Sequence, residues 1–360
     1  MKILVGLSGG VDSAAAAYLM KKQGHLVIGA TMSIWDKNNH AFSGLKTADA
    51  CFSPHEEQDI ESAREICKIL DIPYHTVDCT DIYKKTVLAN FKEEYMSGRT
   101  PNPCVWCNAK IKFQALPDAA RQAGIDFDKF ATGHYARIRL NSETGRYQLL
   151  RGVDPKKDQS YFLYRLSQKQ LSSVVFPLGE KTKSEIRDIA RSVGLPVSDK
   201  QDSQDFYSGD INDILQAEPK PGRFIMKDGT IMGTHNGFWN YTVGQRKGLG
   251  ISAPAPLYVL GFDKDNNNVI VGFEDENICH FLTAENLCWS SGEAPASPFR
   301  ALAKIRSSQP PTPVSVTPLS ADEIKIDFEL NQRGIAAGQS VVLYDGDLVL
   351  GGGIIKKSGK

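Results

Sequence analysis

An octapeptide near the N-terminus, residues 6–13, combines three glycines with two serines and an aspartate. It follows an apolar run at residues 3–5 that is typical of a buried strand, and it precedes an alanine-rich segment, residues 14–20, that is typical of a helix. Glycines let the backbone approach a ligand closely, and the free N–H groups of a first helical turn point toward it. The pattern therefore predicts an anion-binding site. The other interpretation is an ordinary glycine-rich turn.

Asp12 indicates what kind of anion this loop binds. A carboxylate repels phosphates unless a cation lies between them, so Asp12 predicts a bound Mg²⁺. The hydroxyls of Ser8 and Ser13 add further hydrogen-bond donors. No lysine follows the glycines, which excludes the Gly-Lys-Ser/Thr type of nucleotide loop. The hexapeptide Ser-Gly-Gly-Val-Asp-Ser instead resembles the PP-loop of ATP pyrophosphatases, which implies ATP binding and cleavage of its α–β bond.

A second candidate centre lies around Cys107. Pro101 and Pro103 disfavour a helix before it, and Asn108 is a plausible cap for the helix that follows. Cys107 would then lie beside a helix N-terminus, where the dipole favours the nucleophilic thiolate. The alternative is half of a structural zinc site, but no second Cys-x-x-Cys or suitable pair of histidines accompanies it.

Two further polar groups could belong to a site. His134 ends a predicted strand at residues 130–135, where it either faces the active site or serves the fold. Residues 156–160 are polar and partly basic, and they precede an aromatic stretch at residues 161–164. Basic residues beside aromatic ones can bind a nucleic acid, although a solvated charge run ahead of a core helix has the same pattern.

The elements that position these groups follow an alternating pattern in the N-terminal half. Predicted strands at residues 3–5, 26–32 and 73–79 alternate with helices, and capping boxes at Ser53 and Thr182 mark two helix starts. This predicts a parallel sheet with helices on both faces and a ligand beyond the carboxyl ends of its strands. We predict an α/β fold with a doubly wound parallel-sheet domain at residues 1–205, a small β-rich domain at 206–285 and a C-terminal β-barrel at 286–360.

The composition is compatible with this organisation. A chain of 360 residues suits two or three domains, and no apolar run approaches the roughly 18 residues of a membrane span. The first strand follows Met1 and Lys2 directly, so no signal peptide is expected. Seven cysteines without a regular framework suit a reducing cytoplasm. The formal net charge is zero, which disfavours promiscuous nucleic-acid binding but allows a local basic groove.

Taken in order, these stretches resemble the MnmA family of tRNA-specific 2-thiouridylases over essentially the whole chain. The motifs that carry the resemblance are residues 6–13, 100–108, 131–135, 157–163, 244–250 and 350–355. The resemblance implies a PP-loop domain of the adenine nucleotide alpha hydrolase type, a central linker domain and a C-terminal barrel. It also implies that the C2 oxygen of the wobble uridine attacks ATP and releases pyrophosphate. A persulfide on Cys107 then supplies sulfur and AMP leaves, so the implied partners are tRNA and a persulfide donor or relay protein.

The same resemblance implies roles for individual residues, with Cys107 and Asp12 as the catalytic pair. The residues implied to bind ATP are Gly6, Leu7, Ser8, Gly9, Gly10, Val11, Asp12, Ser13, Met32 and Gly133. Those implied to meet the target base or the rest of the tRNA are Asn102, Pro103, Cys104, His134, Lys157, Asp158, Gln159, Arg306 and Gln339.

The chain departs from the family pattern at two positions. Tyr207 stands where the family has its second catalytic cysteine, and Ser307 follows Arg306 where the family usually has a tyrosine. The first departure leaves the release of sulfur open. The persulfide could attack C2 directly, with an external thiol resolving the product. Alternatively, a [4Fe–4S] cluster held by Cys104, Cys107 and, as the third candidate ligand, Cys51 could carry sulfide on an open iron. Two other functions also stay open: a tRNA-binding paralogue without thiolase activity, and a PP-loop ligase that adenylates another acceptor.

Overall fold

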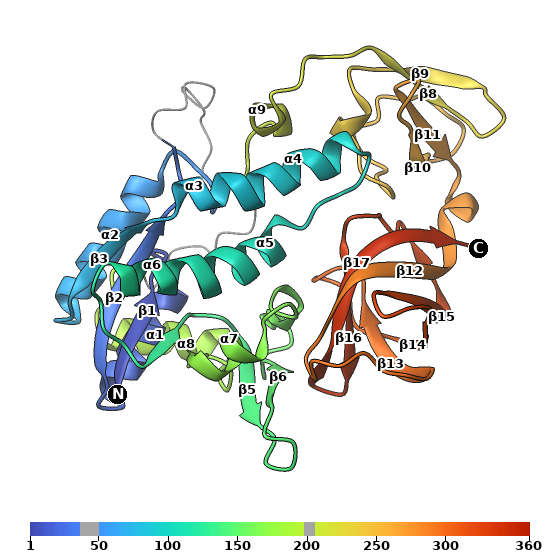
Figure 1. Cartoon of the computed structure of the whole chain (residues 1–360). Coiled ribbons are helices and arrows are strands. Elements are labelled where there is room, and N and C mark those ends of the chain that lie inside the picture. Colours follow the sequence, from blue (N-terminus) through green and yellow to red (C-terminus); the bar gives the residue numbers. More distant parts are fainter. Residues whose placement is uncertain (37–49, 198–205) are drawn as a thin grey trace.

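The computed structural model describes residues 1–36, 50–197 and 206–360, and a parallel sheet forms the centre of its N-terminal domain (Figure 1). The five strands lie in the order β3-β2-β1-β4-β7, and each neighbouring pair is parallel. Side chains alternate along β1, so Ile3 and Val5 enter one apolar core and Leu4 enters the other. The strands are β1 (Lys2–Gly6), β2 (Leu26–Ser33), β3 (Tyr74–Asp78), β4 (Lys129–Ala131) and β7 (Val174–Val175).

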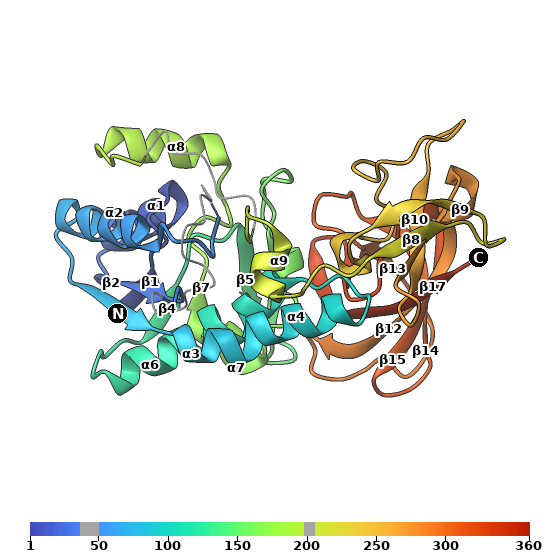
Figure 2. The same cartoon turned by 90° about the horizontal axis from the view of Figure 1, so that it is seen from above.

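Helices cover both faces of this sheet, as Figure 2 shows, with α1, α2 and α8 on one side and α3, α6 and α7 on the other. Within the described ranges no helix is both long and apolar enough to cross a membrane. π-Helical turns at Lys84–Leu88 and Cys107–Ala115 continue α3 and α5. The helices are α1 (Val11–Lys22), α2 (Glu56–Ile69), α3 (Thr80–Tyr83), α4 (Ala89–Met96), α5 (Pro103–Trp106), α6 (Leu116–Gln122), α7 (Gln168–Ser173) and α8 (Lys183–Ser192).

Of the two predicted capping boxes, one is present and the other is not. At the start of α8 the Thr182 hydroxyl and the Glu185 carboxylate cap each other's backbone N–H groups, as predicted. At the start of α2, Glu56 does not reach back to Ser53. Its buried carboxylate instead accepts the N–H of Ile34 at the end of β2 (2.6 Å). A buried carboxylate needs a hydrogen-bond partner inside the protein, and the Ile34 N–H supplies one. A capping box at Ser53 would instead have kept the Glu56 carboxylate at the surface.

The middle of the chain forms a small β-rich domain, as predicted. Its strands lie in the order β10-β11-β8-β9, in which only the β11–β8 pair is parallel. A short helix, α9 (Ile211–Leu215), leads into it. The strands are β8 (Gly222–Ile225), β9 (Ile231–His235), β10 (Tyr258–Asp263) and β11 (Asn268–Gly272).

The C-terminal part forms the predicted barrel, which closes where β12 pairs with β17. Its first strand begins at Ile278, before the boundary predicted at residue 285, because β12 runs without interruption through that boundary. A hairpin of β5 (Ala136–Leu140) and β6 (Tyr147–Arg151) extends the sheet beyond β17. The barrel strands are β12 (Ile278–Trp289), β13 (Phe299–Lys304), β14 (Thr312–Pro318), β15 (Glu323–Arg333), β16 (Ser340–Asp345) and β17 (Leu348–Gly359).

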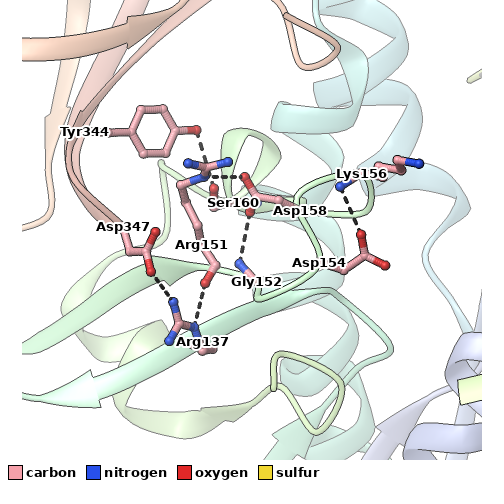
Figure 3. Close-up of polar contacts among 9 residues, drawn as sticks. All are labelled: Arg137, Arg151, Gly152, Asp154, Lys156, Asp158, Ser160, Tyr344 and Asp347. Carbon is pink, nitrogen blue, oxygen red and sulfur yellow. Dashed lines mark hydrogen bonds and ion pairs between the residues drawn. The ribbon is translucent and has the colours of Figure 1, made fainter. Parts of the chain in front are cut away.

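Ionic contacts fix the β5–β6 hairpin to the barrel and to the segment that follows it (Figure 3). Arg137 donates to the carboxylate of Asp347 in the β16–β17 turn (2.6 Å). Arg151 donates to Asp158 (3.2 Å), whose carboxylate also accepts the N–H groups of Gly152 and Ser160. The Asp158 side chain is fully buried. Its charge is therefore paired inside the fold, and the contact of Asp158 with tRNA stays a prediction.

The barrel also holds the segment that leads to Cys107. The amide of Gln339 donates to the carbonyl of Pro101 (2.8 Å), and the carbonyl of Ala337 accepts the N–H of Thr100 (2.7 Å). Gly338 lies between these contacts with φ +91°, and a Cβ atom there would come within 2.8 Å of the Thr100 carbonyl oxygen. The close approach of the two backbones thus requires glycine.

We expect Gly338→Ala to destabilise the protein more than a matched glycine substitution. Gly346 also has a positive φ, +55°, but a Cβ there would meet nothing within 4 Å. Gly346→Ala should cost about 1 kcal/mol from backbone strain alone. Gly338→Ala should cost about 2 kcal/mol more, because its methyl group is forced against the Thr100 backbone. Thermal unfolding of both variants tests this, and equal melting temperatures would show that the contact adjusts freely.

Candidate active site

The PP-loop joins β1 to α1 and has a shape fixed by its own hydroxyl groups. The Ser13 hydroxyl accepts the N–H of Ser8 (3.1 Å) and donates to the carbonyl of Gly10 (3.1 Å). Gly9 has φ +69°, and a Cβ there would come within 2.6 Å of the Asp59 carbonyl oxygen. Ser8 is exposed. The loop is therefore preorganised, with an exposed hydroxyl beside the first turn of α1.

Gly133 packs directly on this loop. A Cβ at Gly133 would come within 2.6 Å of the Asp12 carbonyl carbon and within 2.7 Å of the Ser13 nitrogen. Met32 lies near the carboxyl end of the neighbouring strand β2. The residues predicted to bind ATP thus gather at the carboxyl edge of the sheet, where ligands of parallel α/β folds bind.

Asp12 is paired with a cation from the protein itself. The Lys183 ammonium donates to both carboxylate oxygens of Asp12 (2.7 and 2.8 Å), and the Tyr135 hydroxyl donates to one of them (2.8 Å). The side chains of Lys183 and Asp12 are 12% and 28% exposed, so the pair is partly shielded from water. The cation beside Asp12, which the sequence suggested would be Mg²⁺, is in this structure an ammonium group.

We expect Lys183→Met to slow ATP-dependent pyrophosphate release by at least about tenfold. The ammonium lies at the mouth of a phosphate-binding loop, where it can stabilise charge that develops on the leaving pyrophosphate. Lys181→Met is the matched control, because Lys181 precedes the same helix without contacting Asp12. Pyrophosphate release with tRNA and ATP is the measurement. A normal rate in Lys183→Met would restrict this lysine to a structural role.

The segment predicted as a loop before Cys107 is helical. α5 begins at Pro103, and the Asn102 side chain caps it by accepting the N–H of Val105 (3.4 Å). Proline is tolerated at the first helical position because its missing N–H would have no partner there anyway. Cys107 therefore lies one turn inside the helix, and the predicted role of Asn108 as a helix cap is wrong.

The environment of Cys107 favours the thiol, not the predicted thiolate. Burial raises the pKa of Cys107 to about 11, Lys112 lowers it in part, and the charge of Cys51 raises it further. The helix dipole acts mainly within the first turn, whereas burial penalises the charged form at any position. The predicted activation by the helix N-terminus is therefore wrong for this structure, and Lys112 is the group that favours the thiolate.

Cys107 shares its neighbourhood with Cys51 and Cys104. Burial, followed by the charges of these three cysteines, raises the pKa of Tyr83. For Lys112, burial lowers the pKa, but the same three cysteines raise it more. Within the described ranges, however, no three His, Cys, Asp or Glu side chains are placed to hold a metal ion. The three thiols do not form a site that fits the [4Fe–4S] cluster considered from the sequence.

His134 connects the two halves of the site. It follows Gly133, which packs on the PP-loop, and its Nδ1 lies 2.8 Å from the hydroxyl of Thr132. Burial, together with the positive charge of Lys112, lowers the pKa of His134 to about 3. The imidazole is therefore neutral near pH 7, and it offers a hydrogen bond rather than a charge to a ligand.

The other residues predicted to bind tRNA lie along the joint between the domains. Gln159 accepts the N–H of Tyr135 (3.0 Å), and Arg306 donates to the carbonyl of Gly334 (2.7 Å). Lys157, two residues before Gln159, is half-buried. Gln339 holds the segment before α5 by donating to the carbonyl of Pro101.

The side chain of Tyr207 has a polar and an aromatic partner within the fold. It donates to the carboxylate of Asp213 (2.7 Å), and its ring lies 6.3 Å from that of Phe52. Burial, then Asp213, raises the pKa of Tyr207 above its usual range. The Lys-x-Asp/Glu-Ser segment that precedes it, residues 200–203, lies outside the described ranges.

Comparison with known proteins identifies the family. Three family models match the chain in succession: a tRNA methyl transferase HUP domain at residues 1–207, a tRNA methyl transferase PRC-barrel domain at 211–273 and an aminomethyltransferase beta-barrel domain at 279–355. A relative named tRNA-specific 2-thiouridylase MnmA, from Endomicrobium trichonymphae, is 50% identical over 357 residues, which cover 99% of each chain. The chain belongs to the MnmA family of tRNA-specific 2-thiouridylases.

A second relative agrees with this MnmA assignment, and the family predicted from the sequence is confirmed. This relative, with the name tRNA-specific 2-thiouridylase MnmA 1, from Caldanaerobacter subterraneus subsp. tengcongensis, is 42% identical over 364 residues, covering 99% of this chain and 98% of the relative. Both relatives are named as tRNA-specific 2-thiouridylases. A solved 4-thiouridine synthetase–RNA complex with bound ATP aligns at 16% identity with a TM-score of 0.32, covering 60% of this chain and 45% of that chain.

Two residues of this MnmA-family site were missed by sequence reasoning. Lys183 looked like the first residue of a capped surface helix, and Tyr135 looked like the end of a strand. Both reach Asp12 only because α8 packs beside α1 and the loop after β4 packs on the PP-loop. The one available signal was the absence of a lysine within the PP-loop, which implies that a cation must come from another segment.

Proposed function

We propose that this MnmA-family protein adds sulfur to C2 of the wobble uridine of tRNA in an ATP-dependent reaction. One observation carries the proposal. Gly133 packs on the PP-loop, and the ring of its neighbour His134 lies 5.6 Å from that of Phe113, on the helical turn that begins at Cys107. An anion site for ATP and a thiol that can carry sulfur thus meet around one loop, as a reaction with an adenylation step followed by a sulfur-transfer step requires.

In the first step, the C2 oxygen of uridine attacks the α-phosphate of ATP and pyrophosphate leaves. The PP-loop N–H groups, the Ser8 hydroxyl and the Lys183 ammonium lie where they can bind the departing phosphates. Asp12 is the residue that would hold a Mg²⁺ ion, which would supply further charge neutralisation when ATP is bound. Lys183 already satisfies both oxygens of that carboxylate, so binding of the metal would share or displace this contact.

In the second step, a Cys107 persulfide supplies sulfur to the activated C2, and AMP leaves. The persulfide comes from an external donor or relay protein. A base in a single-stranded tRNA loop can leave its stack to reach such a buried centre. Asn102, Pro103 and Cys104 lie on the first turn before Cys107, and His134, Lys157, Gln159, Arg306 and Gln339 are the side chains proposed to contact the tRNA. We infer a cytoplasmic location, where tRNA is modified.

Mass spectrometry of tRNA nucleosides from a strain that lacks the protein tests this function. Loss of a 2-thio wobble uridine, restored by the wild-type gene, is the expected result. An unchanged nucleoside profile would instead favour one of the two other functions, a tRNA-binding paralogue or a ligase with another acceptor. Pyrophosphate release by the purified protein with ATP and acceptors other than tRNA, ammonia or amines included, separates those two, because only the ligase would release pyrophosphate, whereas the paralogue would bind tRNA without using ATP.

A further inference from the structure

The chain around Cys51 lies against the segment that carries Tyr207. The N–H of Phe52 donates to the carbonyl of Phe206 (3.0 Å), and the two rings stack with their centroids 6.0 Å apart. Phe52 is buried, and its ring lies 5.6 Å from that of Tyr83. Cys51, the residue before this anchor, is exposed and lies outside any helix or strand. The backbone beside Cys51 is therefore anchored, while its side chain is exposed.

Tyr83 connects the segments that carry Cys51 and Cys107. The ring of Phe52, the residue after Cys51, lies 5.6 Å from that of Tyr83, and α3, which carries Tyr83, packs against the helical turn that begins at Cys107. A negative charge on Cys51 contributes to the raised pKa of Cys107, and both cysteines also act on Tyr83 and Lys112. One sulfur of this pair is exposed, whereas the other is buried. An exposed thiol beside a buried one is the arrangement in which the first can attack a sulfur carried by the second.

We propose that Cys51 is the resolving thiol of this enzyme, a role that rests on the proposed persulfide at Cys107. The Cys51 thiolate attacks Sγ of the Cys107 persulfide, so that a Cys51–Cys107 disulfide forms and the Sγ–S bond of the persulfide breaks. The terminal sulfur leaves as hydrosulfide with both electrons of that bond. Two cysteine thiols are thereby oxidised to one disulfide, and the sulfane sulfur is reduced. Hydrosulfide then attacks C2 and displaces AMP, and an external dithiol reduces the disulfide.

The other side chains near Cys107 cannot take this role. A phenol such as Tyr207 forms no disulfide, and its hydroxyl is already bonded to Asp213. Cys104 lies three residues before Cys107 on one continuous helix. Such neighbours have Cβ atoms about 5–6 Å apart, whereas a disulfide needs about 3.5–4.5 Å. Cys79 is buried, and burial raises its pKa to about 12.

Release of sulfide from the loaded protein tests the proposal without ATP or tRNA. The full chain is treated anaerobically with inorganic polysulfide and desalted, after which sulfide is measured over time and tryptic peptides are mapped without reduction. Cys51 lies in peptide 47–64, and Cys107 lies in peptide 100–110 together with Cys104. The Cys104→Ser variant therefore assigns the cross-link to Cys107. Cys279→Ser, which removes a thiol from barrel strand β12, is the matched control.

Wild type, Cys104→Ser and Cys279→Ser should each form the 47–64/100–110 cross-link as sulfide is released. Cys51→Ser should release sulfide at least about tenfold more slowly, and added dithiothreitol should restore the release. Equal release by Cys51→Ser without added thiol, a cross-link to another cysteine, or no sulfur uptake on Cys107 would each overturn the proposal. Failure of the proposed function would give a different combination of results. In that case the cross-link and the sulfide form, but tRNA is not thiolated in the complete reaction.

Discussion

Replacing Cys107 by serine is expected to abolish thiolation of tRNA while pyrophosphate release continues. A hydroxyl oxygen cannot carry sulfane sulfur, so the second step has no donor, whereas the first step involves only ATP and the uridine oxygen. Both products are measured in one reaction, as 2-thiouridine by mass spectrometry and as pyrophosphate. The expected loss in the rate of 2-thiouridine formation is at least about a thousandfold, which corresponds to about 4 kcal/mol in activation free energy.

Cys67→Ser provides a matched control for the Cys107 variant. Cys67 is also a buried cysteine, on α2 in the other apolar core, and burial raises its pKa to about 12. Its substitution should lower stability without selectively removing thiolation. A Cys107→Ser protein that still forms 2-thiouridine would remove this residue from the mechanism. Loss of both products in Cys107→Ser, with the control active, would instead mean that the thiol is needed to bind the tRNA.

The sequence was most informative where the chemistry depends on consecutive residues. The PP-loop could be predicted because its strand, glycines and helix follow one another directly, and these local preferences agree with the fold. The capping box at Thr182 was predictable for the same reason. The contact that connects these two sites, Lys183 to Asp12, joins residues 171 positions apart. No local pattern contains that information, because it arises from packing of α8 beside α1.

The prediction at Cys107 failed for a different reason. Two prolines were taken to exclude a helix, but Pro103 occupies the single helical position at which proline is favourable. The electrostatic environment of Cys107 then depends on Lys112 and on Cys51. The contribution of Cys51 comes from a distant segment, and the burial that dominates the pKa of Cys107 exists only in the folded protein. A sequence can indicate a candidate nucleophile, but burial and charges from distant segments determine its pKa.

The second large effect is expected for Asp12→Ala, which should lower pyrophosphate release by at least about tenfold. Two causes act together. The variant removes the carboxylate that would hold Mg²⁺, and it leaves the Lys183 ammonium without the partner that positions it. A partly buried ammonium that loses its acceptor should also cost about 1–3 kcal/mol of stability. Asp188→Asn, which changes an exposed carboxylate on α8, is the matched control and should behave as wild type.

The Asp12→Ala/Lys183→Met double variant separates these two causes. If Asp12 acts mainly by positioning Lys183, removing both side chains should slow pyrophosphate release no more than removing Lys183 alone, so the two effects are not additive. If Asp12 also holds Mg²⁺, the double variant should be slower than Lys183→Met alone, and extra Mg²⁺ should accelerate Lys183→Met but not Asp12→Ala. Normal pyrophosphate release in Asp12→Ala would contradict both roles, because the loop would then bind and activate ATP without either charge of the pair.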